Sequence, residues 1–290
     1  MLHTSFKKIL PSLLVCTVII CLYYVFSGQI ILPQIFSVGS ITIHYYGIIM
    51  ALAVAGGFYL AEKRSEKYGI KGAAAQNVLF CIIVGGFVGA RLYHVFSSFG
   101  YYQHNVIDIF KVWNGGLSIY GAIIGGLIAL FLYRRLDKDA LWQPKGIFVF
   151  FVLLDWLTPS LIVGQIIGRF GNLFNYEAFG YPTNLPWKMF VPLEFRKSDF
   201  ASHDFFHPWF LYEQIGLLIV FLIVRKSEKS EKNHLFLWYL LLYNILRFGL
   251  EFLRVDSTFI GSFRLNSLTS FILIIISGAL ITRKRKLESV

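Results

Sequence analysis

Polar residues that interrupt an apolar stretch are the first candidates for chemistry in this sequence. Between Gly164 and Gly180 the chain reads GQIIGRFGNLFNYEAFG, and apolar sequence leads into it from Ile147. The side chains with strong hydrogen-bonding capacity in this stretch are Arg169, Asn172, Asn175 and Glu177. Such groups are costly at the end of a hydrophobic segment unless they meet a partner or a ligand. We therefore expect the centre of a functional site here, with Gly180 closing it.

A second group of polar and charged residues lies in apolar sequence nearer the C-terminus. The segment YNILRFGLEFLRVD contains Asn244, Arg247, Glu251 and Arg254, and their spacing predicts one shared helical face. One glutamate and two arginines leave a positive charge over. This charge either belongs to a structural network that joins helices or is neutralised by an anionic ligand, and we favour the ligand. The planar fork of arginine suits phosphate because it donates two parallel hydrogen bonds.

The composition of the whole chain indicates where these residues must lie. Of its 290 residues, 56% are hydrophobic and only 15% are charged, and the mean hydropathy is +0.63. Soluble domains carry about 25% charged residues. We therefore predict an all-α polytopic membrane protein with seven core transmembrane helices and one extra N-terminal helix. The apolar runs that approach the ~20 residues a span requires lie at 10–26, 44–61, 75–97, 117–133, 146–169, 208–224, 235–253 and 265–282.

Basic residues predict the orientation of these spans. Clusters of Lys and Arg precede the first span, follow the second, fourth and sixth spans, and close the chain. Such clusters lie preferentially in the cytoplasm, so both termini are predicted to be cytoplasmic. The net charge of +11 then reflects membrane topology, and no nucleic acid is expected as a partner.

With this orientation, the unusual polar residues gather in the outer half of the membrane. Tyr46 opens the second span, Arg91 lies in the outer half of the third, and Tyr120 opens the fourth. Together with the arginines above, they predict a basic, tyrosine-containing cavity at the depth of outer-leaflet phospholipid headgroups. The cysteines lack CxxC spacing and the histidines are scattered, so neither a metal nor a cofactor is expected. Glycines of the third and fourth spans, such as Gly89 and Gly125, predict close helix packing.

The motifs together resemble one bacterial family, the phosphatidylglycerol–prolipoprotein diacylglyceryl transferases. GRFGNLFNYEAFG matches the family signature, and HYYG, GARLY, VWNGGLS, HPWFLYE and RFGLEFLR follow the family's order over residues 44–280. The resemblance implies a multi-pass protein of the bacterial cytoplasmic (inner) membrane with its active site facing the outer leaflet. It also implies transfer of a diacylglyceryl group from phosphatidylglycerol to the lipobox cysteine in the signal peptide of a preprolipoprotein. A thioether forms and glycerol phosphate leaves.

The resemblance also assigns roles to individual residues. Arg169, Arg247 and Tyr120 are expected to be catalytic. The residues expected to bind substrate are Tyr46, Arg91, Asn172, Asn175, Glu177, Gly180, Glu251 and Arg254. Two positions depart from the family, because Tyr120 stands where histidine is usual and Tyr176 stands where glycine is usual. Tyrosine, with a reference pKa of about 10, is a poor general base at neutral pH but still forms hydrogen bonds.

The predicted organisation has two parts. Residues 1–43 form an N-terminal anchor helix and an outer loop, and residues 44–290 form the transferase-like membrane domain with a long outer loop at 181–207. Two other functions remain open at this point. One is a transporter or flippase for an anionic solute or lipid, and the other is a relative that binds phospholipid without catalysis. The clustering of charge at one membrane face favours the enzyme, since a transporter needs polar groups along a path across the bilayer.

Overall fold

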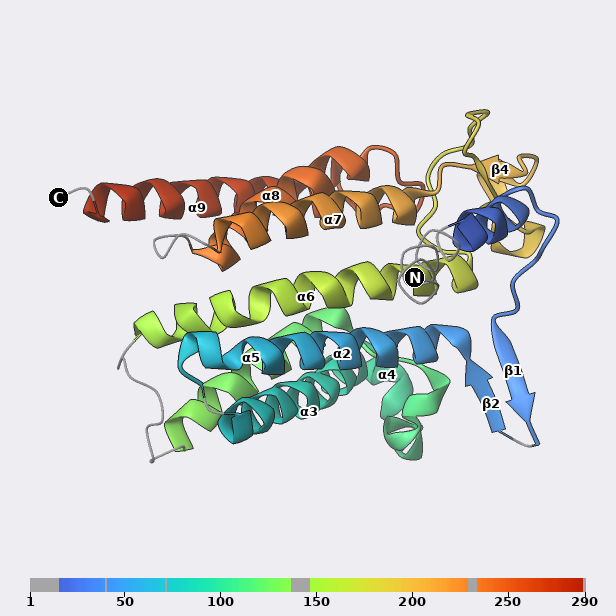
Figure 1. Ribbon diagram of the computed structural model, residues 1–290. Helices are drawn as coiled ribbons and strands as arrows, with labels where there is room; N and C mark the ends of the chain where they lie inside the picture. Colours follow the sequence, from blue (N-terminus) through green and yellow to red (C-terminus); the bar gives the residue numbers. More distant parts are fainter. Residues whose placement is uncertain (1–15, 40, 71, 137–146, 229–233, 289–290) are drawn as a thin grey trace, which may run out of the picture. The chain divides into compact units, whose positions relative to one another are not determined.

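The computed structural model describes residues 16–39, 41–70, 72–136, 147–228 and 234–288, and most of them are helical (Figure 1). Within these ranges, five helices are long and apolar enough to cross a membrane, which confirms the prediction of a polytopic helical protein. They span Tyr45–Tyr68, Gly72–Ser97, Ile119–Leu136, Phe150–Asn175 and Leu265–Arg283. The predicted spans 208–224 and 235–253 coincide with helices α7 (Trp209–Ser227) and α8 (Leu235–Glu251).

The first predicted span, 10–26, lies partly outside the described residues. Its described part is a helix, Cys16–Phe26, which has fewer residues than a membrane crossing requires. Residues 10–15 and the basic residues before them belong to the part of the chain that the structure does not describe.

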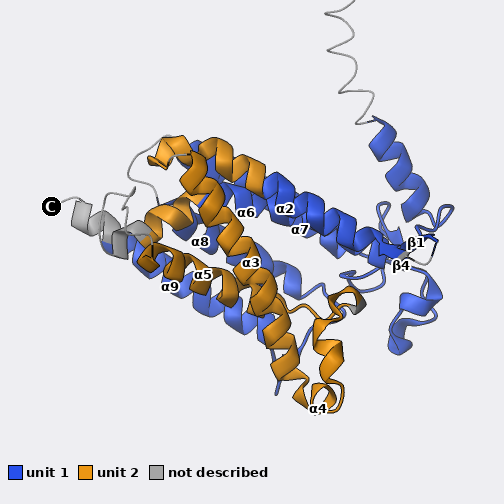
Figure 2. Ribbon diagram, turned by 90° about the horizontal axis from the view of Figure 1, so that it is seen from below, with its two compact units in different colours: residues 1–57, 157–290 blue, residues 58–156 orange. Residues whose placement is uncertain are grey.

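The chain divides into two compact units, residues 1–57 with 157–290 and residues 58–156 (Figure 2). The division cuts two helices, α2 (Tyr45–Arg64) and α6 (Ile147–Asn175), and does not follow the sequence boundary at 43/44. It falls beside Gly56 and Gly57 in α2 and close to Pro159 in α6. Both residue types weaken a helix, glycine through its backbone entropy and proline through its missing N–H group.

The smaller unit is built on the packing of α3 (Gly72–Ser97) against α5 (Ile119–Leu136). A Cβ atom added to Gly89 would collide with the carbonyl oxygen of Gly121, and one added to Gly125 would collide with that of Gly85. The glycines therefore let the two backbones touch, which confirms the predicted packing. The short elements of this unit are η1 (Ser65–Tyr68), α4 (Phe99–Tyr102), η2 (Val106–Phe110) and η3 (Val112–Asn114).

In the larger unit, α8 packs against both α7 and α9 (Leu265–Glu288), as Figure 1 shows at its orange and red end. Buried apolar residues of α6, α7 and α8 form one core cluster, which includes Ile162, Leu217 and Leu235. Two short strands, β5 (Phe259–Ile260) and β6 (Phe263–Arg264), form a hairpin between α8 and α9. The helices thereby bring the end of α6, the start of α7 and the end of α8 into one unit.

The predicted outer loop 181–207 is folded and shares a hydrophobic cluster with the N-terminal helix, α6 and α7. Strands β3 (Met189–Phe190) and β4 (Phe205–Phe206) pair, and η4 (Leu193–Phe195) and η5 (Ser198–Phe200) connect them. Met189 and Phe206 are buried together with Val25 of the N-terminal helix. A hairpin of β1 (Ile35–Val38) and β2 (Ile41–His44), with Ile35 opposite His44, then leads into α2.

Candidate functional site

The predicted centre of the site lies on the last turns of α6 and the residues that follow it. The helix continues to Asn175, beyond the predicted end of the span at 169, so Arg169 and Asn172 project from helical backbone. Arg169 Nη2 donates to Glu213 Oε1 at 2.7 Å, and Glu213 is fully buried in α7. Arg169 Nη1 donates to Asn172 Oδ1 at 3.4 Å, and Asn172 Nδ2 donates to Glu177 Oε1 at 2.8 Å. Three residues of the predicted signature therefore form one hydrogen-bonded chain that ends on α7.

The backbone after α6 has an unusual conformation. Tyr176 and Ala178 have φ angles of 49° and 53°, in the left-handed region that residues with a Cβ atom rarely adopt. Glu177 lies between them, and its carboxylate returns to the helix at Asn172. The reversal of the chain at the end of α6 thus places Glu177 in the site.

Gly180 fixes this segment to the rest of the unit through its backbone. Its N–H group donates to the carbonyl of His207 at 2.8 Å, and a Cβ atom at this position would lie 2.6 Å from the carbonyl oxygen of Leu253. Only glycine permits this approach, which pairs Gly180 with Arg254 in a backbone bridge. The geometry therefore gives Gly180 a packing function, with its N–H group already bonded.

The ring of Tyr46 lies against Gly171 of α6, the residue before Asn172. A Cβ atom on Gly171 would come within 2.7 Å of the Tyr46 ring, so the glycine makes room for the tyrosine. Asn175 contributes its carbonyl group, which accepts a hydrogen bond from Gln34 Nε2 at 3.4 Å. Tyr46 therefore lies beside the signature segment of α6, whereas the contact of Asn175 goes to the N-terminal segment.

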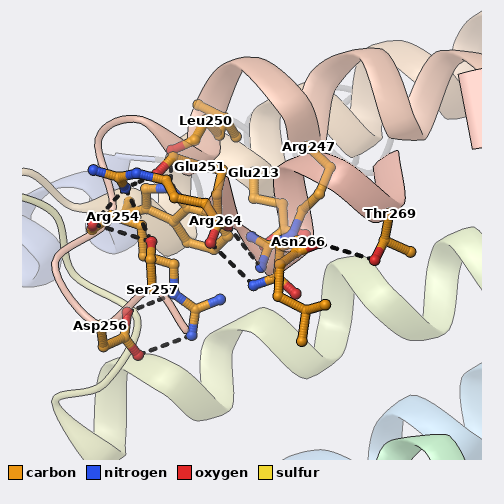
Figure 3. A network of polar contacts seen from close by, with 12 residues as sticks. Glu213, Arg247, Leu250, Glu251, Arg254, Asp256, Ser257, Arg264, Asn266 and Thr269 are labelled. Atoms are coloured by element: carbon orange, nitrogen blue, oxygen red, sulfur yellow. Dashed lines mark hydrogen bonds and ion pairs between the residues drawn. The ribbon is translucent and has the colours of Figure 1, made fainter. Parts of the chain in front are cut away.

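The second predicted group is only partly on one helical face. Arg247 Nη2 lies 3.2 Å from Glu251 Oε2, and Glu251 Oε1 accepts a hydrogen bond from Asn266 Nδ2 at 3.0 Å (Figure 3). The helix ends at Glu251, so the prediction that Arg254 shares its face is wrong. Asn244 bonds to Leu240 of its own helix. The spacing alone did not reveal that the helix stops between the glutamate and the second arginine.

Arg254 has its own acidic partner beyond the helix. Its Nε and Nη2 atoms contact the two carboxylate oxygens of Asp256 at 2.5 Å and 2.8 Å (Figure 3). Burial opposes ionisation of Asp256, but the hydrogen bond and charge of Arg254 lower the pKa of this carboxyl group on balance. Burial likewise opposes the charge of Arg254, and Asp256 raises the pKa of the guanidinium on balance. Both groups are therefore ionised at neutral pH.

Arg264 binds backbone groups at the C-terminal end of α8, and no carboxylate among the described residues pairs with its guanidinium group. Its Nη1 atom donates to the carbonyls of Glu251 at 2.5 Å and Arg254 at 3.2 Å, groups that a helix C-terminus leaves without partners. Its other hydrogen bonds go to the hydroxyl oxygens of Ser257 and Tyr181. The hydrogen bonds of Arg264 thus reach only uncharged oxygens among the described residues, while the carboxylates of Glu177, Glu213, Glu251 and Asp256 match the four arginines of the site in number.

Trp209 is the common neighbour of the three other arginines. Its ring centroid lies 4.5 Å from the guanidinium carbon of Arg247, 5.1 Å from that of Arg254 and 5.9 Å from that of Arg169. The indole is fully buried, and its Nε1 atom donates to the carbonyl of Leu250 at 2.6 Å. The negative face of an aromatic ring attracts cations. Trp209 therefore stabilises three like charges beside one another, and we call these four residues the arginine cluster.

Three buried atoms of the site lack hydrogen-bond partners among the described residues. One is a donor, Arg247 Nη1, and the other two are acceptors, Glu213 Oε2 and Glu251 Oε2. Buried polar groups are normally hydrogen-bonded, and an unsatisfied one in a native structure requires an explanation. A donor beside two further arginines is suited to an oxygen atom of an anion.

The remaining predicted residues belong to the smaller unit. Arg91 is buried, and its guanidinium donates to the backbone carbonyls of Asp108, Ile109, Lys111, Gly115 and Gly116. It thereby folds the segment that leads into α5. Tyr120, in the first turn of α5, is half exposed and lies 6.2 Å from the ring of Tyr93.

Sequence reasoning did not identify all the residues of the site. The sequence patterns above assign no role to Trp209, Glu213, Asp256, Arg264 or Asn266. The motif HPWFLYE carried a signal, since an aromatic and an acidic residue four positions apart share a helical face.

Fold and site together define a polytopic helical membrane protein with a cluster of arginines and carboxylates around a buried tryptophan. Residues 33–283 match the model of the family described as prolipoprotein diacylglyceryl transferase, and the chain belongs to this family. It is 40% identical over 291 residues to the phosphatidylglycerol–prolipoprotein diacylglyceryl transferase of Thermotoga maritima, covering 96% of this chain and 97% of the relative. The proteins of the same name from Fervidobacterium nodosum and Acaryochloris marina are 40% and 38% identical. These alignments cover 95% and 83% of this chain, and 94% and 86% of the relatives.

Proposed function

We propose that this chain transfers a diacylglyceryl group from phosphatidylglycerol to the lipobox cysteine of a preprolipoprotein. The names of the relatives support the reaction, and the observation that carries it in this chain is the arginine cluster. Three guanidinium groups meet around Trp209 on residues of the family motifs, and Arg247 retains a buried donor without a partner. Such a cluster fits the phosphate diester of phosphatidylglycerol.

The reaction is a displacement at a glycerol carbon. The cysteine sulfur attacks the carbon that carries the phosphate ester, a C–S bond forms, and the C–O bond to phosphate breaks. Glycerol phosphate leaves with the electron pair, and the thiol proton passes to a base. A thiol has a reference pKa of about 8.5, so positive charge nearby favours the reactive thiolate. Arg169 and Arg247 stabilise both this thiolate and the negative charge that develops on the departing phosphate.

The other residues hold these arginines and the headgroup. Glu213 fixes Arg169, and Glu251 fixes Arg247. Asn172, Tyr46 and Arg254 orient the headgroup. Asn175, Glu177 and Gly180 shape the loop around it.

For Tyr120 we keep the role that the family resemblance implies, a hydrogen bond to the phosphate or the thiol. Arg91 supports it, because its carbonyl contacts at Gly115 and Gly116 order the chain shortly before α5 begins. In this proposal Arg91 acts on substrate indirectly, by ordering the segment that leads to Tyr120.

We further propose that α7 and α8 complete seven core spans and that an additional N-terminal span precedes them. In this arrangement both termini are cytoplasmic, and the arginine cluster lies at the outer leaflet of the bacterial cytoplasmic membrane. The distribution of Lys and Arg supports this orientation. Phosphatidylglycerol and the signal peptide of the acceptor then reach the site from the same leaflet.

The test is a reconstitution with defined substrates. Purified protein, phosphatidylglycerol vesicles and a lipobox peptide are expected to yield a peptide heavier by one diacylglyceryl group, and a peptide with serine in place of cysteine is expected to yield none. Arg169→Lys keeps the charge but loses the bidentate fork, so most of the activity should disappear. Arg225→Lys, at a half-exposed arginine that pairs with the buried side chain of Glu228, is the matched control and should remain active. A wild-type rate in Arg169→Lys contradicts the proposed role, and no product from the wild-type protein contradicts the function.

A further inference from the structure

Tyr176 occupies a conformation that normally requires glycine. Its φ angle of 49° is left-handed, and Ala178, two residues later, has a φ angle of 53°. A residue with a Cβ atom pays about 1–2 kcal/mol for this conformation. Such strain persists only where the surrounding structure holds the residue firmly. Contacts of the Tyr176 side chain must therefore stabilise this turn.

Those contacts come from two directions. The hydroxyl oxygen of Tyr176 accepts a hydrogen bond from the backbone N–H group of Leu32 at 2.6 Å. The ring stacks on Phe195 of the outer loop, with centroids 5.1 Å apart and an interplanar angle of 21°. The side chain is almost completely buried. Tyr176 thus connects the end of α6 to the N-terminal segment and to the outer loop.

The N-terminal segment contacts the residues before Tyr176 as well. We call residues 27–45 the strap. Gln34 Nε2 donates to the carbonyl of Asn175, and the ring of Tyr45 stacks on Phe174 at 5.2 Å and 19°. The strap therefore follows the last turn of α6 from Phe174 to Tyr176.

The strap is itself anchored in the larger unit. Phe26, directly before it, meets Phe210 edge to face at 6.5 Å. Gly28 lies so close to Phe190 that a Cβ atom would come within 2.7 Å of the ring. Val25 is buried in the cluster that contains Trp209. The N-terminal helix and the strap are thus built into the core beside the arginine cluster.

We infer that Tyr176 is a positioning residue through which the strap holds the arginine cluster in its reactive arrangement. Tyr176 precedes Glu177, which binds Asn172, which in turn binds Arg169. The strap therefore determines the position of the Arg169 side chain without contacting substrate. The inference rests on the proposed function, and it assigns a purpose to the segment that precedes α2.

A double-mutant cycle tests the path. Tyr176→Phe keeps the ring and removes the hydroxyl that Leu32 binds. Loss of one such hydrogen bond is expected to lower kcat/KM by about three- to tenfold. Glu177→Ala breaks the path at the next step, so Tyr176→Phe should have almost no further effect in that background. Tyr59→Phe, at an exposed tyrosine of α2, is the control and should be neutral. Independent, multiplying effects of the two changes, or full activity of Tyr176→Phe, overturn the inference.

Amide hydrogen exchange provides a second measurement that does not depend on catalysis. Tyr176→Phe should accelerate exchange in residues 28–35 and 172–180 and leave α9 unchanged. Gln34→Ala, a milder change in the strap, should shift the same two segments in the same direction. Unchanged exchange in both segments contradicts the strap. If the wild-type protein shows no transferase activity but the two variants still show this exchange pattern, the strap is supported and the proposed function is contradicted.

Discussion

Replacement of Trp209 by leucine is the sharpest test of the arginine cluster. The substitution removes the aromatic face that three guanidinium groups share, and it leaves every arginine and carboxylate in place. A leucine side chain keeps part of the apolar volume but has no π-electrons. The positive charges are then expected to repel one another and move apart.

The size of the effect follows from the geometry. A cation–π contact contributes about 0.5–1 kcal/mol when exposed and about 2 kcal/mol when desolvated. Arg247 has the shortest distance, 4.5 Å, and a side chain that is only 13% exposed. Arg254 and Arg169 lie at 5.1 Å and 5.9 Å, with side chains 21% and 24% exposed. The contacts together amount to about 2–4 kcal/mol, so kcat/KM should fall about 30-fold or more.

The assay must separate this effect from lost stability. Trp156 is the matched control, because it is also fully buried and its Nε1 atom also donates to a backbone carbonyl, that of Ala61, at 2.7 Å. Both leucine variants should lower Tm, since each removes a large buried side chain and a hydrogen bond. Transfer kinetics are measured well below either Tm. The reasoning is refuted if Trp209→Leu retains the kcat/KM of Trp156→Leu.

Further predictions concern the turn, the ion pair and the tyrosine. Gly180→Ala should lower Tm and activity strongly because its Cβ atom would lie 2.6 Å from the Leu253 carbonyl oxygen. Gly249→Ala, with open space around it, is the control and should leave both unchanged. Equal Tm values for the two variants would contradict the packing function of Gly180. Asp256 has a lowered pKa, so its ion pair stabilises the fold above the unfolded value of about 3.9 and loses this contribution as pH falls through the folded pKa. The Tm difference between wild type and Asp256→Asn should therefore be present at pH 7 and shrink below about pH 4, and a difference that does not change with pH would argue against the pair. For Tyr120, phenylalanine should slow transfer and histidine should be tolerated, and a fully active Tyr120→Phe enzyme removes this hydroxyl from the mechanism.

Much of the helical architecture was predictable because apolar runs of span length have few other solutions. The meeting of Arg169 and Asn172 was not predicted, because the span was expected to end at 169, whereas α6 continues to Asn175 and places the two residues on one face. The importance of the Tyr176 position was also visible, since a tyrosine stands where a glycine is usual, and the structure explains it by a positive φ angle.

Other features depend on contacts that periodicity does not encode. Arg254 falls at helical spacing from Glu251, but Arg264 of strand β6 binds the carbonyl of Glu251, the last residue of α8, and that of Arg254 beyond it. Trp209 lies in sequence so apolar that a core residue and a cation-binding residue look alike. The pairing of β3 with β4 joins short segments whose strand character comes from their partners.

The balance of charge within the arginine cluster bears on turnover. Glu213, Glu251 and Asp256 each accompany one arginine, so a lipid phosphate that enters must compete with carboxylates that are already present. When glycerol phosphate leaves, the same carboxylates form ion pairs with the guanidinium groups again. A site with this balance of charge binds its anion transiently, so the charged product does not remain bound and block it.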